Sequence, residues 1–264
     1  MRDQFETIKI ERPSPDVLQI TLNRPGSANA MNTQMGIDLL DVFTELGADP
    51  DFCRAVVLTG AGDKAFCAGG DLKQRHGMTD AAWQAQHHIF ERQVRALIDC
   101  PMPVIAAVNG VAYGGGCEMA LACDFIYAAR QVRFALPEVT LGIMPGAGGT
   151  QTLARAVGER RAKELLLSGK PWSAEDAAAW GMVNRLCDAT NLLPEALTIA
   201  RTIADNAPIS IRQAKRSMHH GLSLSLADGM LFEIEAYNRM VPTEDRREGV
   251  AAFNEKRKPV FKGR

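Results

Sequence analysis

Hydrophobic and polar positions alternate near the start of the chain and then change to a helical spacing. Ile8 and Ile10, followed by the run 17–22, predict two strands joined around residues 13–16. From Thr33 to Leu46, apolar residues recur three and four positions apart, which predicts an amphipathic helix that Thr33 is able to cap. The chain is therefore expected to open with a pair of strands and a helix.

The middle of the chain alternates short apolar runs with helical segments. The runs 54–60, 104–108 and 125–127 predict buried strands, and residues 81–99 predict a long helix. Short apolar strands that alternate with helices are typical of an α/β core in which the strands pair mainly in parallel.

Helices dominate from about residue 150 onward, with one short strand expected at 182–186. The part from residue 192 reads as almost wholly helical: Pro208 starts one helix, and residues 243–245 place acidic side chains in the first turn of the last. We therefore divide the chain into an α/β core, residues 1–191, and a helical C-terminal region, residues 192–264.

Composition excludes several classes of protein. The chain has 264 residues, 46% of them hydrophobic, which is enough for a large core. Its 30 lysine and arginine residues nearly balance 31 aspartate and glutamate residues, so no global basic field suits nucleic acid or an anionic membrane. No apolar run approaches the roughly 20 residues that span a bilayer, and the N-terminus lacks the pattern of a signal or transit peptide. The six cysteines show no C-x-x-C spacing and are expected to be reduced core thiols, which suits a cytoplasmic protein.

Three glycine-containing segments are candidates for chemistry: 65–73, 109–118 and 136–151. In the second, Gly114, Gly115 and Gly116 present backbone N–H groups that no Cβ shields, and a helix is expected to begin there. The N-terminus of a helix and its unpaired N–H groups together stabilise a developing oxyanion. Glu118 follows about one turn later and can face the same bound group. The alternative is a tight turn that only packs a helix on a strand.

The other two segments are weaker when they are taken alone. Gly70 in the first segment offers a second free amide, and Lys73 one turn later suits a phosphate or a carbonyl. In the third segment Pro137 suits the first position of a helix and Glu138 its first turn, where a carboxylate is ordinarily a surface group that stabilises the helix dipole.

Other catalytic motifs are missing from the sequence. Residues 146–151 do not complete the G-x-G-x-x-G of a dinucleotide site, and no phosphate-binding loop, serine-nucleophile elbow or H-E-x-x-H motif occurs. The adjacent histidine pairs at 87–88 and 219–220 lack the i, i+4 spacing of metal ligands. We therefore expect no metal site.

Together the three segments resemble the enoyl-CoA hydratase/isomerase (crotonase) superfamily. The resemblance rests on the runs 105–110, 114–118 and 145–151 in this order, and it extends from residues 23–25 to residues 253–258. It implies an α/β fold, a crotonase-like spiral of ββα units whose helical C-terminal region builds trimers, commonly stacked as hexamers. It also implies an acyl-CoA thioester substrate and no cofactor other than the coenzyme A that the substrate itself carries.

The resemblance also implies roles for particular residues. The amides of Gly70 and Gly115 would form an oxyanion hole, and Glu118 and Glu138 match the two glutamates that hydratases of the superfamily use. The residues expected to bind the substrate, beside Gly70 and Gly115, are Ser27, Ala28, Ala68, Asp71, Leu72, Lys73, Phe253 and Lys256. Of these, Phe253 and Lys256 match residues that reach coenzyme A from a neighbouring subunit, and residues 246–264, with seven basic against two acidic side chains, suit its phosphates.

Several functions remain open at this point. Hydration of a short-chain 2-enoyl-CoA ranks first, and hydration of a branched glutaconyl-CoA such as 3-methylglutaconyl-CoA ranks second, because residues 71–75 and 241–246 resemble that branch. A distal carboxylate needs a cation, and Arg75, His76 or Lys73 could supply it. A double-bond isomerase ranks third, because isomerases of the superfamily often keep only the second glutamate.

Two hypotheses from other classes are nucleic-acid binding and a purely structural assembly. One member of the glutaconyl branch binds RNA through a lysine-rich helix, but residues 33–51 here hold no lysine or arginine and five acidic residues. An acidic face repels phosphate, so no nucleic-acid partner is expected. A structural protein would leave a 2-enoyl-CoA chemically unchanged.

Overall fold

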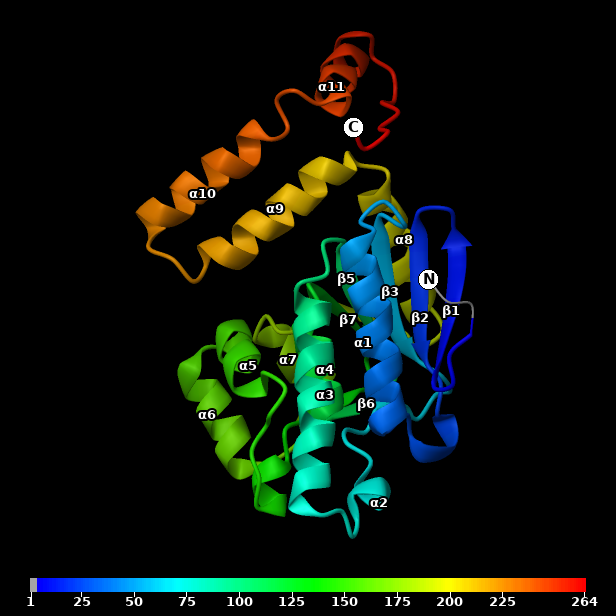
Figure 1. Cartoon of the computed structure of the whole chain (residues 1–264), viewed down its shortest axis with the longest axis vertical. Helices are drawn as coiled ribbons and strands as arrows, with labels where there is room; N and C mark the ends of the chain where they lie inside the picture. Colours follow the sequence, from blue (N-terminus) through cyan, green and yellow to red (C-terminus); the bar gives the residue numbers. More distant parts are fainter. Residues whose placement is uncertain (1–3) are drawn as a thin grey trace.

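The computed structural model describes residues 4–264 and shows two sheets wrapped by helices, with a group of C-terminal helices projecting to one side (Figure 1). The larger sheet has the strand order β1-β2-β3-β5-β7-β10. Its strands are β1 Ile8–Ser14, β2 Val17–Leu22, β3 Ala55–Gly60, β5 Val104–Val108, β7 Phe125–Ala129 and β10 Arg185–Cys187. Only β1 pairs antiparallel; every other neighbouring pair in this sheet is parallel. Strands β2, β3 and β5 are buried along their whole length, which is why their sequences are almost continuously apolar.

The smaller sheet consists of very short strands. It has the order β4-β6-β8-β9, with β4 Ala65–Cys67, β6 Val111–Tyr113, β8 Arg133–Ala135 and β9 Trp172–Ser173. The first three strands run parallel to one another. Each of them follows a strand of the larger sheet along the chain and leads into helical structure, in the orders β3-β4-α2-α3, β5-β6-α4 and β7-β8-η2-α5. This repetition confirms the expected spiral of ββα units.

Helices cover the larger sheet and close its core. Helix α1 (Thr33–Ala48) packs against α3 (Asp80–Ile98), while α8 (Leu192–Ala204) packs against β3 and β5. Helix α4 (Gly115–Ala122) is short and largely buried, and α5 (Gly149–Val157) packs against both α4 and α6 (Glu159–Ser168). Short turns complete the core region: η1 Pro25–Ser27, α2 Leu72–Arg75, η2 Glu138–Leu141 and α7 Ala174–Ala179.

The last three helices extend away from the sheets (Figure 1). They are α9 (Pro208–Gly221), α10 (Leu226–Asn238) and α11 (Glu244–Asn254), and α9 packs along α10. The buried face of α8 belongs to the main core, so the projecting part of the structure begins after α8. The domain boundary between residues 191 and 192 stays a prediction.

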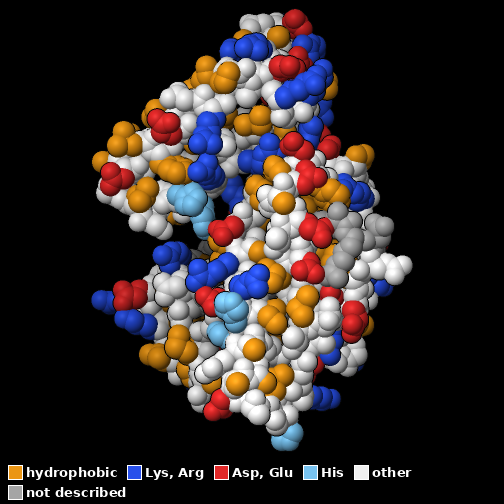
Figure 2. All heavy atoms as spheres, in the orientation of Figure 1, with side chains coloured by type: hydrophobic (Ala, Val, Ile, Leu, Met, Phe, Trp, Pro, Cys, Tyr) orange, Lys and Arg blue, Asp and Glu red, His pale blue; other side chains and the backbone are white. Residues whose placement is uncertain are grey.

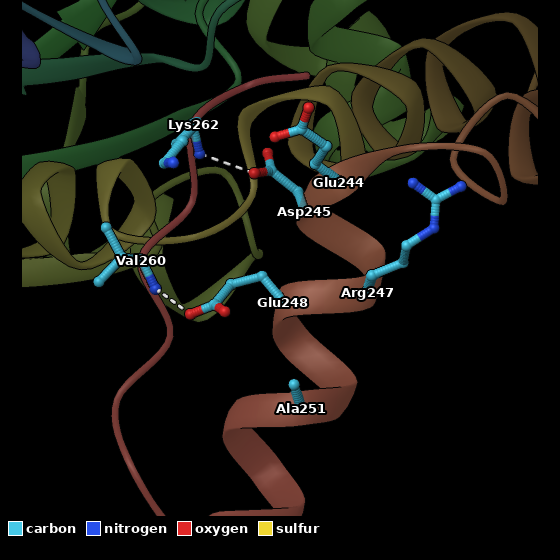
Figure 3. A pocket seen from close by; sticks show the side chains of 7 residues that line it. All are labelled: Glu244, Asp245, Arg247, Glu248, Ala251, Val260 and Lys262. Carbon is cyan, nitrogen blue, oxygen red and sulfur yellow. Dashed lines mark hydrogen bonds between the residues drawn. The ribbon is translucent and has the colours of Figure 1, made fainter.

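The polypeptide after α11 folds back and is fastened to that helix (Figure 3). The carboxylate of Asp245 accepts hydrogen bonds from the amides of Lys262 and Gly263, at 2.6 and 2.8 Å, and Glu248 accepts one from the amide of Val260 at 2.8 Å. Glu248 also pairs with Arg257. The carboxylates that line the hollow between α11 and this segment are therefore already engaged in hydrogen bonds and ion pairs. These contacts fasten the C-terminal segment to α11.

Two local expectations were wrong in detail. Thr33 was expected to cap the first long helix, but Asn32 does so, because its side chain accepts a hydrogen bond from the amide of Met35 at 2.9 Å. The strand expected at 182–186 begins only at Arg185, because the amides of Met182 and Val183 turn back to the carbonyl of Ala177 and close the end of α7.

All six cysteines are buried and none forms a disulfide, as expected of core thiols. Burial raises the pKa of their thiols, to about 11 at Cys67 and Cys100, for example. Such thiols stay protonated near neutral pH and are poor nucleophiles. Within residues 4–264 no helix is both long and apolar enough to cross a membrane.

Candidate active site

Three loops meet where β4, β6 and β8 end. Parallel strands place their C-terminal ends at the same edge of a sheet, and Cys67 lies beside Ala112 and Tyr113 beside Ala135 in the register. The loop after β4 carries Gly69 and Gly70, the turn after β6 carries residues 114–116, and the segment after β8 carries Glu138. The smaller sheet therefore gathers the three segments that the sequence singles out.

The amides of Gly70 and Gly115 lie close together. A Cβ added to Gly115 would be 4.0 Å from the nitrogen of Gly70, so the two residues are close neighbours. The amide of Met31 donates to the carbonyl of Gly69, and the carbonyl of Met31 accepts from the amide of Asp71, so the Gly70 N–H points away from the main chain of Met31. The N–H of Gly115 belongs to the first residue of α4, where helical N–H groups have no partner within the helix. The two amides therefore remain candidates for the expected oxyanion hole.

Only glycine suits the turn that leads into α4. Gly114 has φ +52° and ψ −127°, a conformation that side-chain-bearing residues rarely adopt. Gly116 lies so close to the preceding loop that a Cβ there would be 2.1 Å from the carbonyl oxygen of Cys67. This close packing presses the start of α4 against the loop that carries Gly70.

Glu118 is buried in the first turn of α4 and held by main-chain donors. Its Oε1 accepts hydrogen bonds from the amides of Ala147 and Gly149, both at 2.8 Å, at the N-terminal end of α5. Burial raises the pKa of Glu118, and the two hydrogen bonds, from Gly149 and Ala147, counter part of that rise by favouring the carboxylate. The pKa of Glu118 therefore stays above its ordinary value, but by less than burial alone would give.

Glu138 has a different environment. It lies in the first turn of η2, as expected, although Pro137 precedes this 3₁₀ turn rather than occupying its first position. Its Oε2 is buried without a hydrogen-bond partner among the described residues, and its Oε1 would be 3.1 Å from a Cβ on Gly114. Burial raises the pKa of Glu138 to about 7, and the charge of Glu118 adds to that rise. This carboxyl group therefore holds a proton more readily than an ordinary glutamate.

A cavity of about 770 Å³ opens onto these groups. Its wall includes the site loops with Ala68, Gly70, Gly115, Glu118 and Glu138. The rest of its wall is mainly apolar and aromatic, formed by Met31, Leu72, Trp83, Phe90, Leu141, Ile143, Met144 and Pro145, with Arg75 and His87 between them. Such a cavity suits a largely apolar ligand with a polar end at the site loops.

The segment with Ser27 and Ala28 lies against the first site loop. The carbonyl of Ala28 accepts from the amide of Ala68 at 3.1 Å, and Arg24 pairs with Asp71 at 2.9 Å. Burial would raise the pKa of Asp71, but hydrogen bonds from the amide of Gln74 and from Arg24 lower it. Asp71 also caps α2 through the amides of Lys73 and Gln74, so its observed contacts hold the loop in place.

The other residues expected to bind substrate are more dispersed. Leu72 lines the cavity, whereas Lys73 is exposed and does not line it. Phe253 lies in the last turn of α11, in the projecting region (Figure 1), and Lys256 follows just after that helix. Neither residue lines this cavity. Phe253 is 84% exposed. Their contact with substrate in a neighbouring subunit stays a prediction.

Several parts of this site were not predicted from the sequence. The amides of Ala147 and Gly149 belong to the glycine-rich segment 136–151, but their hydrogen bonds to Glu118 were not expected. Trp83 and Phe90 were not predicted either, although they belong to the long helix at 80–98 and could have been found as an aromatic pair seven residues apart on one helical face. Among residues 4–264 no three histidine, cysteine or acidic side chains gather in a way that could hold a metal ion.

Comparison with known proteins identifies the family of this chain. The model of the enoyl-CoA hydratase/isomerase family matches residues 13–264. The mitochondrial enoyl-CoA hydratase of Pongo abelii is 42% identical over 92% of this chain and 82% of its own, and the short-chain-enoyl-CoA hydratase of Clostridium acetobutylicum is 38% identical over 92% of each chain. The crystal structure of enoyl-CoA hydratase from Bacillus anthracis superposes with a TM-score of 0.96 at 41% identity, covering 98% of this chain and all of that one. The chain therefore belongs to the enoyl-CoA hydratase/isomerase family, with the crotonase fold.

Proposed function

We propose that the protein adds water across the double bond of a 2-enoyl-CoA thioester to give a 3-hydroxyacyl-CoA. The amides of Gly70 and Gly115 bind the thioester oxygen and draw electron density from C3. Glu118 takes a proton from a water molecule as its oxygen bonds to C3, and Glu138 gives its proton to C2 on the same face. No metal and no cofactor beyond the coenzyme A of the substrate takes part in this scheme.

The different surroundings of the two glutamates carry this proposal. Glu118 accepts two main-chain hydrogen bonds that favour its charged form, while Glu138 has an unpartnered buried oxygen and a pKa of about 7. A base and an acid side by side are what the addition of water requires. Two carboxyl groups at one cavity support hydration over isomerisation, which moves a single proton between two carbons.

The proposal is tested by adding crotonyl-CoA and following the ultraviolet absorbance of the conjugated thioester. Hydration removes the conjugation, so the absorbance falls, and the product is identified as 3-hydroxybutyryl-CoA by mass and retention time. A double-bond isomerase gives a product of unchanged mass, and a purely structural protein leaves the absorbance constant. Either result would reject the hydratase assignment.

The pH dependence of the reaction should reflect both glutamates. Glu138 acts while protonated, so kcat/KM should decline as pH rises through about 7, the pKa that burial gives this group. On the acidic side kcat/KM should also fall, because protonation of Glu118 removes the base. A profile of kcat/KM from about pH 5 to 9 checks this bell shape, and a steady rise through neutral pH would contradict the proposed roles.

Two classes of acyl chain remain candidates for the substrate. A short unbranched 2-enoyl chain fits the apolar walls of the cavity and ranks first. A branched glutaconyl chain such as 3-methylglutaconyl ranks second, supported by the position of Arg75 on the cavity wall. Values of kcat/KM for crotonyl-CoA and 3-methylglutaconyl-CoA rank the two.

We also propose that α9–α11 assemble the protein into trimers or hexamers. These helices expose many large apolar side chains, among them Met218, Leu222, Leu226, Met230, Leu231, Ile234, Tyr237 and Phe253, and Figure 2 shows such side chains along the projecting helices. An apolar surface of this kind is typical of protein interfaces. Sedimentation equilibrium should give about three or six times the chain mass of 28.7 kDa. A monomeric mass at micromolar concentration would contradict the proposal.

A further inference from the structure

Few main-chain contacts hold the loop that leads from η2 into α5. Within residues 144–147, no main-chain group forms a hydrogen bond with another main-chain group of the described chain. The amide of Ala147 donates instead to Oε1 of Glu118, as does the amide of Gly149 at the start of α5. The direction of these two donors therefore depends on the side chains that pack against the loop.

One such side chain is that of His87, a half-buried residue of α3 that lines the cavity. Its ring occupies the space beside Gly146 in which another residue would carry its side chain. A Cβ on Gly146 would be 2.3 Å from Cε1 of His87 and 2.9 Å from its Nε2. Gly146 does not have a positive φ, so its backbone conformation would accept alanine. The ring of His87 is therefore what makes glycine necessary at this position.

No other contact accounts for the position of the imidazole. Its nitrogens form no hydrogen bond and no ion pair within residues 4–264, whereas the neighbouring His88 is exposed and lies 3.9 Å from a carboxylate oxygen of Glu91. Cε1 and Nε2 of His87 lie beside the α-carbon of Gly146, which offers no conventional hydrogen bond. The geometry therefore favours a packing role over proton exchange. The other titratable groups on the cavity wall are Arg75, His88, Glu91, Tyr113, Glu118 and Glu138.

We propose that His87 is a positioning residue that holds the loop of residues 144–147 against Glu118. Its ring fills the space beside Gly146 and so keeps the amides of Ala147 and Gly149 within hydrogen-bonding distance of Oε1. These bonds favour the charged form of Glu118, which the proposed hydration requires. The inference rests on the proposed hydratase function and adds to it a residue that acts through Glu118.

Two substitutions of His87 test this role. His87→Ala removes the ring, and His87→Gln keeps a planar group of similar length that does not titrate. The alanine variant should lower kcat for crotonyl-CoA by about tenfold with little change in KM, because a loosened loop aligns Glu118 less well. Weaker hydrogen bonds also raise the pKa of Glu118, so the acidic limb of the kcat/KM profile should move to higher pH. His87→Gln should keep most of the kcat and the original pH profile.

Hydrogen exchange of the loop gives a readout that does not depend on turnover. The amides of Ala147 and Gly149 should exchange at least about tenfold faster in His87→Ala, and at the unaltered rate in His87→Gln. The matched control is Arg92→Ala, which shortens an exposed side chain of α3 outside the cavity. It should change neither the kinetic constants nor the exchange rates.

Gly146→Ala tests the same contact from the side of the loop. The added methyl group displaces the ring of His87, so this variant should also lose about tenfold in kcat. When His87→Ala is combined with it, the methyl group has room beside α3. The double variant should therefore be more active than Gly146→Ala alone.

Each outcome decides for or against the inference. Unaltered kcat and exchange rates in His87→Ala overturn it, and so does a double variant that is no better than Gly146→Ala. A loss in His87→Gln equal to that in His87→Ala also overturns it, because the effect then comes from the charge or the proton of the imidazole. A change in KM alone would mean that His87 only contacts the acyl chain. If the loop exchanges faster in His87→Ala but the unaltered protein does not hydrate crotonyl-CoA, the proposed function fails and the packing role of His87 stands.

Discussion

Glu118→Gln should lower the turnover of a 2-enoyl-CoA by roughly a thousandfold, and Glu138→Gln should do the same. In the first variant the amide oxygen can still accept from Ala147 and Gly149, so the position of the side chain is kept while the base is lost. In the second variant the carboxyl group of Glu138, one oxygen of which is buried without a partner, becomes an amide. An amide cannot deliver a proton to C2. Turnover is measured at saturating substrate by the loss of thioester absorbance.

Binding separates a chemical role from a structural one in these variants. A saturated acyl-CoA should bind to both with a dissociation constant close to that of the unaltered protein, because neither substitution changes the shape of the cavity. Glu164→Gln is the matched control: this glutamate lies exposed on α6 and outside the cavity, so both turnover and binding should stay unchanged. Near-normal turnover in either of the first two variants would reject the proton-transfer roles.

Gly116→Ala should disrupt the site through packing alone. The new methyl carbon would be 2.1 Å from the carbonyl oxygen of Cys67 and 2.8 Å from its carbonyl carbon, so α4 and the loop after β4 must move apart. These two segments carry the amides of Gly115 and Gly70, and a misplaced oxyanion donor costs about a hundredfold or more in turnover. We also expect the free energy of unfolding to fall by about 1–3 kcal/mol.

Gly47→Ala is the matched control for this substitution. Gly47 lies near the end of α1, and nothing comes within 4 Å of an added Cβ. The free energy of unfolding should rise by about 0.5–1 kcal/mol, because alanine loses less backbone entropy in a helix than glycine. Turnover should not change. If Gly116→Ala also hydrates crotonyl-CoA normally, the contact between α4 and the loop after β4 does not set the geometry of the site.

The sequence predicted the large sheet better than the small one, for a physical reason. Strands such as 104–108 are buried on both faces, and a continuous apolar run signals this burial directly. Strands β4, β6 and β8 have three residues each, which is too short for an alternating pattern to stand out from a loop. The short strands that position the site loops were therefore the hardest to predict from the sequence.

The candidate site was predicted in part. Spacing within one segment placed Glu118 one turn after Gly115, and the structure has both in the first turn of α4. By contrast, the partners of Glu118 lie about thirty residues further along the chain, and their position depends on how α5 packs on α4. A contact of this kind follows from tertiary packing, which local patterns do not encode.

The proposed oxyanion donors are main-chain groups at the ends of paired strands, whereas the proposed proton carriers are side chains. A single codon change can replace Glu118 or Glu138, but it cannot remove an amide of Gly70 or Gly115 unless proline is introduced or the backbone moves. As related enzymes diverge, most mutations therefore keep the main-chain donors that would stabilise an enolate. Mutations of the two glutamates, in contrast, readily change how that enolate is protonated. One scaffold can in this way give rise to enzymes with different products from a shared intermediate.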